Sequence, residues 1–195
     1  MEIITEICCL LVGLSLIPLS GCVEMATWHL NCDTKGDFEM LPPDGYQRGV
    51  SYELQHDVFL MCSENGKAKR EGFLVAPTSL KGGSPRIHSS PRTVDEWVAK
   101  DGDMSRWDGT WAKNYGIDDY EVILGVVKRG TRIRMKYMRT RKTISVWFGR
   151  TSYKTPIGII EAGTYEGWTV DMADISRWYP EKRVDSRLLK MISSD

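Results

Sequence analysis

The chain has 195 residues, which is long enough for one domain with a sizeable hydrophobic core. Its 26 basic and 26 acidic side chains cancel, and removal of residues 1 to 21, which contain two glutamates and no Lys or Arg, would leave a net charge of about +2. A balance this even excludes a dedicated nucleic-acid binder, so no nucleic-acid partner is expected.

The chain opens with an apolar stretch from Ile7 to Gly21, whose only polar side chains are two cysteines and two serines. As a helix it would be about 22 Å long, too short for a hydrocarbon core of roughly 30 Å. That length is typical of the central region of a secretory signal peptide. The alternatives are an export signal that is not lipidated, or a buried helix or strand, against which Pro18 and the missing polar face weigh.

The end of this stretch, Leu19-Ser20-Gly21-Cys22, resembles the lipobox of bacterial lipoproteins. The resemblance covers about the first 22 residues. It implies that a diacylglycerol is joined to the sulfur of Cys22, that the chain is cut after Gly21, and that the protein is anchored to a membrane of the cell envelope. Val23 stands where such proteins carry Asp for inner-membrane retention, which implies the outer membrane, facing the periplasm, in a Gram-negative host.

Export would remove Cys8 and Cys9 with the signal peptide, and lipidation would use Cys22, so Cys32 and Cys62 would remain. Two cysteines left in an oxidising compartment suggest one disulfide. The alternative is that Cys62 is a free thiol in the core and that Cys32 lies in a mobile tail.

Residues 22–45 have little periodicity and include two adjacent prolines followed by Asp-Gly, so we expect a tether. Residues 46–195 are then expected to form a single β-rich domain. Alternation over 50–55 and an apolar run over 57–62 predict two strands. The Asn-Gly pair at 65–66 predicts a tight hairpin turn, with 72–76 as the returning strand.

An irregular insert is expected at about 77–119, beginning with a loop rich in Pro, Gly and Ser over 77–92. Thr93 and Glu96 form a capping-box pair, which predicts a short helix from Val94 to about Lys100. The Asp-rich stretch 101–108 has some oxygen ligands suited to calcium but lacks the complete pattern of an EF-hand, so a solvated turn is favoured.

The last third contains five β-rich segments, at 120–127, 131–138, 143–149, 156–162 and 164–171. Together they predict a mainly β fold, a small antiparallel barrel or meander with one or two short helices. The succession of strand, turn and terminal helical turn over residues 120–176 weakly resembles that of SH3-like barrels. A short amphipathic helix is expected from about Lys182 to Met191.

Two groups of residues are candidates for binding. Arg132, Arg134 and Lys136 share one face of a predicted strand and form a positive stripe suited to an anionic glycan, lipid headgroups or an acidic protein. The alternative is a face neutralised by Glu161, Glu166 or Asp171 of neighbouring strands. The second group is the three tryptophans of the insert, Trp97, Trp107 and Trp111. Their flat rings could stack on sugars or anchor a protein partner. The alternative is that the insert packs on the sheet as a lid and that these rings form its small core.

Signals of catalysis are weak. Only His29, His56 and His88 are available as bases, and neighbouring His56 and Asp57 would point to opposite faces of a strand. No nucleophile elbow and no metal-ligand spacing is present, so we expect no cofactor, no metal and no enzyme. The sequence favours a non-enzymatic envelope protein that binds a protein or glycan, with an inhibitor or immunity protein, or a small envelope-polymer hydrolase, as alternatives.

Overall fold

The computed structural model describes residues 32–36, 45–80, 90–116, 120–145, 149–176 and 183–192, with the backbone alone at 32–36, 141–145 and 149–153. Nine strands in these ranges join in one sheet, which confirms the expected mainly β class. The strands are β1 (Cys32–Gly36), β2 (Ser51–Leu54), β3 (Val58–Cys62), β4 (Glu71–Val75), β5 (Val122–Val127), β6 (Arg132–Ser145), β7 (Gly149–Ile160), β8 (Thr169–Asp171) and β9 (Leu189–Ile192).

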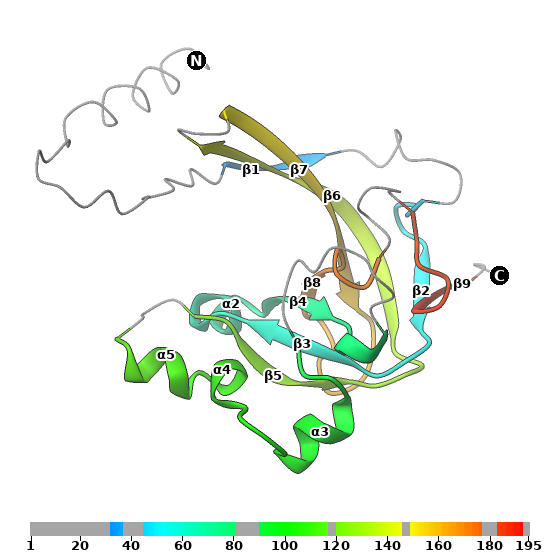
Figure 1. Ribbon diagram of the computed structural model, residues 1–195. Coiled ribbons are helices and arrows are strands. Elements are labelled where there is room, and N and C mark those ends of the chain that lie inside the picture. The colour runs from blue at the N-terminus through cyan, green and yellow to red at the C-terminus, as the bar shows by residue number, and fades with distance from the viewer. Residues whose placement is uncertain are drawn as a thin grey trace, which may run out of the picture.

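The sheet has the order β5-β3-β4-β8-β7-β6-β2-β9, and β1 also pairs with β6. Among the described strands, only β4 and β8 run parallel to each other. The long strands β6 and β7 arch over the part of the sheet that holds β3, β4 and β5 (Figure 1). The edge strands β5 and β9 do not pair with each other in the described part of the chain, so the closed, SH3-like barrel is not confirmed.

A sharp bend links the two parts of the sheet. Glu53 of β2 pairs with Arg132 of β6, and Val58 of β3 pairs with Val127 of β5. The two pairs are the same number of residues apart on both segments, so the β2–β3 segment and the β5–β6 segment bend together without losing register.

Asp57 lies between β2 and β3 and stabilises this bend by binding the turn between β5 and β6. Its Oδ2 accepts a hydrogen bond from Lys128 Nζ at 2.8 Å, and its Oδ1 accepts one from the Arg129 amide at 2.8 Å. Burial alone would raise the pKa of Asp57, but these two hydrogen bonds, together with the charges of Lys128 and His56, outweigh it and leave the pKa below its ordinary value.

Helices cover one face of the β5-β3-β4 part of the sheet: α3 (Val94–Ala99), α4 (Ser105–Asp108) and α5 (Thr110–Asn114). A smaller apolar cluster lies under this layer, and its buried members are Phe59, Met61, Val75, Trp97, Met104 and Ile123. The main core lies on the opposite face and includes Leu60, Leu74, Ile133 and Met135. All five residues of β3 are buried because both of its faces are covered.

Several local expectations are confirmed and others are wrong. Thr93 caps α3 by accepting a hydrogen bond from the Glu96 amide at 3.0 Å, as the capping box predicts. The antiparallel pairing of β3 with β4 is also as expected, but their connection is the helix α2 (Glu64–Lys69) and not a tight turn. Ser63 caps α2, since its hydroxyl accepts from the Gly66 amide at 3.2 Å and removes Gly66 from any hairpin turn.

Further corrections concern the insert and both ends of the chain. Four α-helices and the 3-10 helix η1 (Thr78–Leu80) are present in the described residues, more than the one or two expected. β6 continues through Arg139–Lys142, where a break was expected. The expected C-terminal helix is replaced by β9, which pairs with β2, and β1 lies within the segment expected to be a tether.

Candidate functional site

Trp97 is a core residue of the smaller apolar cluster. It is 7% exposed, and its ring meets the Phe59 ring edge-on at a centroid distance of 6.4 Å. The Lys100 ammonium lies 3.3 Å from the centroid of the Trp97 ring and covers its outer side. The alternative interpretation, in which this tryptophan fastens the insert to the sheet, is therefore the one that the structure supports.

The other two tryptophans of the insert differ in exposure. Trp107 is half-buried against the cluster that holds Trp97. Trp111 on α5 is 46% exposed, and beside it Tyr115 is 71% exposed. The centroids of these two rings are 5.1 Å apart and their planes are tilted by 41°. Of the three candidate tryptophans, only Trp111 is an exposed residue.

The basic stripe lies on the surface, as expected, because Arg132, Arg134 and Lys136 are all exposed. Acidic groups flank it, however. Glu161 lies 3.5 Å from Arg134 Nε and accepts a hydrogen bond from the Ser51 hydroxyl at 2.8 Å. On the β2 side Arg132 is paired with Glu53 in the ladder, so the stripe is partly neutralised by its neighbours.

The cysteines do not form the bridge that the sequence left open. Cys62 is a free thiol, 1% exposed, in the main core. Burial raises the pKa of the Cys62 thiol, and the charge of Lys67 opposes this only in part. Cys32 lies opposite Lys142 on β6, far along the strand from the core positions. Cys22 lies outside the described residues.

The catalytic candidates are not brought together either. His56 is exposed at the bend, and the neighbouring Asp57 is engaged by Lys128 and Arg129 instead. His29 and His88 lie outside the described residues. No group of three His, Cys, Asp or Glu side chains is arranged to hold a metal ion in the ranges that the structure covers.

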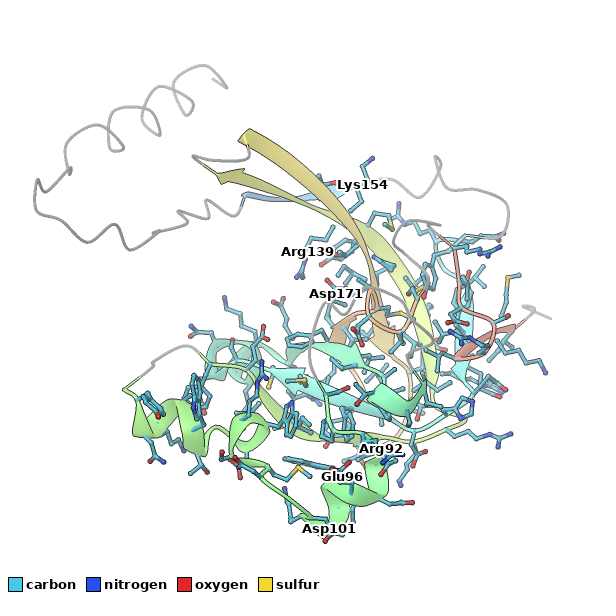
Figure 2. The ribbon with its side chains drawn as sticks, viewed as in Figure 1. Arg92, Glu96, Asp101, Arg139, Lys154 and Asp171 are labelled. Carbon is cyan, nitrogen blue, oxygen red and sulfur yellow. The ribbon has the colours of Figure 1, made fainter. Side chains whose placement is uncertain are left out.

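A polar pocket not foreseen from the sequence lies at the end of β3 and β4, on the inner side of the β6–β7 arch. Its volume is about 190 Å³. The charged lining residues are Arg139 of β6, Asp171 of β8, Glu71 of β4, and Glu121 directly before β5. Figure 2 shows Arg139 and Asp171 close together inside the curve of the arch.

A β-bulge places Arg139 in this pocket. Met135 pairs with Gly158 and Tyr137 with Ile157, so Lys136 is an extra residue without a partner on β7. The bulge reverses the alternation of β6, and Arg139 therefore shares the face of Tyr137. Regular alternation would have put Arg139 on the face of Met135, in the core.

The pairing across the sheet brings Asp171 to the same face. Tyr137 lies opposite Ile157, Ile157 lies opposite Asp171, and Asp171 lies opposite Phe73 of β4. Directly paired residues point to the same face of a sheet, so this row ends beside the pocket. Sequence reasoning missed Arg139 and Asp171 because neither the bulge nor the parallel β4–β8 pair has a local signal.

A second, larger groove lies over β2 and β9, with a volume of about 440 Å³. Tyr52, Leu189, Met191 and Val184 form its apolar part, and Arg183 and Asp185 are the charged residues of its lining. The buried Asp185 carboxylate is bound by Arg187, with Nη2 to Oδ2 at 2.6 Å, so this charge already has a partner.

Comparisons with protein-family models, with curated proteins and with solved structures found no match to this chain. Within the part of the chain that the structure describes, none of the helices has the length and apolar character that a membrane crossing requires.

Proposed function

We propose that this protein is a lipid-anchored component of the bacterial cell envelope that works by binding a protein or glycan partner, without catalysis of its own. The lipobox-like residues Leu19 to Cys22 support the location. The observation that carries the binding function is the exposed aromatic pair, Trp111 and Tyr115, on and directly after α5.

The aromatic pair has the properties of a binding surface. Two large rings held 5.1 Å apart on one short helix expose apolar area that would lose water on contact with a partner. Trp and Tyr are also, together with Arg, the side chains that most often dominate the energy of an interface. Trp97, in contrast, is occupied by Phe59 and Lys100, and the basic stripe is partly neutralised, so neither supports a partner contact as well.

The binding function is tested by pull-down from solubilised envelopes, beside sedimentation with purified envelope glycan. We expect Trp111→Ala to weaken capture about 30-fold, the effect of losing a contact worth about 2 kcal/mol. Val98→Ala is the matched control, because Val98 is an apolar side chain on α3 that is 66% exposed. Equal capture by both variants would refute the assignment of this surface, and a tight complex with an enzyme without glycan affinity would identify an inhibitor.

The location has a separate test. Intact-mass analysis of the mature protein should show a chain that begins at Cys22 and carries added acyl mass. A Cys22→Ser variant should keep residues 1–21 and partition into water and detergent differently from the wild type. An unmodified wild-type mass would remove the anchor from the proposal without affecting the surface around Trp111.

A further inference from the structure

We propose that the polar pocket beneath the β6–β7 arch binds a small molecule that carries one carboxylate together with ammonium groups, with a diamino acid as the best match. The site is made by Arg139, Asp171, Glu71 and Glu121 and not by the aromatic pair. The inference therefore goes beyond the proposed function and does not depend on it.

The charges of the lining determine the class of ligand. A simple cation would face the guanidinium of Arg139, and a simple anion would face the carboxylates of Glu71, Glu121 and Asp171. A ligand with both kinds of charge can place each group beside its opposite. Because three carboxylates stand against one guanidinium, a ligand with two ammonium groups and one carboxylate complements the pocket better than one with a single ammonium.

The charged groups come from different parts of the fold, and three of the four have partners within the protein. Arg139, Glu121 and Asp171 all take part in interactions within the protein, and Asp171 Oδ1 also accepts a hydrogen bond from the Ala173 amide at 2.9 Å. Side chains that are already ordered lose little further freedom when a ligand arrives. The pocket is thus preorganised.

The size and the inner wall of the pocket also suit a small ligand. A volume of about 190 Å³ admits a molecule of amino-acid size and excludes a folded partner. Cys62, the last residue of β3, forms part of the wall and is 1% exposed. The half-buried Phe73 offers a less polar surface to the carbon chain of a ligand.

Calorimetric titration of the full chain in a nonionic detergent tests the charge requirement with four probes of similar length. Lysine carries all the charged groups, 6-aminohexanoate lacks the α-ammonium, 1,5-diaminopentane lacks the carboxylate, and hexanoate lacks both ammonium groups. We expect lysine to bind most tightly and each loss of a charged group to weaken binding by about tenfold or more. Binding of 1,5-diaminopentane as tight as that of lysine, or no binding of lysine, would overturn the proposal.

Variants assign the site to these residues. Arg139→Met should weaken lysine binding about tenfold or more and should abolish the preference for lysine over 1,5-diaminopentane. Arg134→Met is the matched control, since it removes a guanidinium from the same strand at a position that does not line the pocket. If circular dichroism shows that Arg139→Met does not fold, Glu121→Gln decides, because Glu121 is exposed; unchanged lysine binding by that variant would then count against the site.

The same chemistry is available from a free diamino acid and from a peptide that ends in lysine. The dipeptide Ala-Lys keeps the carboxylate and two ammonium groups but extends beyond the dimensions of lysine. Affinity equal to that of lysine identifies a peptide end as the ligand, and affinity at least about tenfold weaker identifies the free amino acid.

Discussion

Replacement of Trp97 by Ala tests whether the insert is fastened to the sheet by this side chain. The ring is 7% exposed, packs edge-on against Phe59, and lies under the Lys100 ammonium. Truncation of a buried Trp typically costs about 3–5 kcal/mol. The smaller cluster lies close to the surface and can relax, so we expect a loss of about 3 kcal/mol, or about 6–12 °C in Tm for a chain of this size.

The measurement is urea unfolding of the full chain, followed by far-ultraviolet circular dichroism, which does not depend on tryptophan emission. Trp111→Ala is the control, because Trp111 is 46% exposed and stands outside both apolar clusters. Its free energy of unfolding should change by less than about 0.5 kcal/mol. A loss below about 1 kcal/mol for Trp97→Ala, or equal losses for the two variants, would refute the packing argument.

Three further perturbations follow from the same structure. Burial raises the pKa of Tyr46, so the stability it contributes is present below about pH 10 and falls above that by up to about 1.4 kcal/mol per pH unit; Tyr46→Phe should flatten this decline in unfolding experiments. Asp57→Asn keeps an acceptor for the backbone amide at the bend but loses the charge that binds Lys128, so in thermal melts it should cost less than Asp57→Ala, which we expect to lose about 1 kcal/mol; equal losses would contradict this order. Gly109→Ala would put a Cβ 2.3 Å from a tyrosine ring at a φ of +85°, whereas Gly49→Ala at a φ of +82° meets no atom within 4 Å. Both variants bear the conformational cost of about 1–2 kcal/mol, but only Gly109→Ala should lose more free energy of unfolding than this and show the larger drop in Tm.

Elements that depend on residues close together in the sequence could be predicted correctly. Alternating residues in β2, the apolar run of β3 and the capping pair of α3 each predicted the correct element because side-chain period and local hydrogen bonds decide them. Long-range pairing overrode local signals elsewhere. The basic segment Arg139–Lys142 resembles a turn by composition, yet it continues β6 because β7 supplies a partner for each of its residues.

Short segments with mixed signals were the least predictable. Leu188 and Leu189 fit one side of an amphipathic helix, but pairing with β2 buries Leu189 opposite Leu54 and makes the segment a strand. The pocket residues could not be predicted from the sequence for a related reason. Arg139 and Asp171 are 32 positions apart and meet only through the joint effect of a bulge and two strand pairings.

The unpaired Lys136 gives β6 one residue more than its partner strand uses at this point. Met135 and Tyr137 already lie opposite the neighbouring residues Gly158 and Ile157, so deletion of Lys136 would give a regular ladder and leave Met138 and Arg139 on their present faces. The strand can therefore lose a residue here without a change in which side chains face the core. Laboratory evolution of the protein should accordingly accept many side chains at position 136 and also recover variants that lack it.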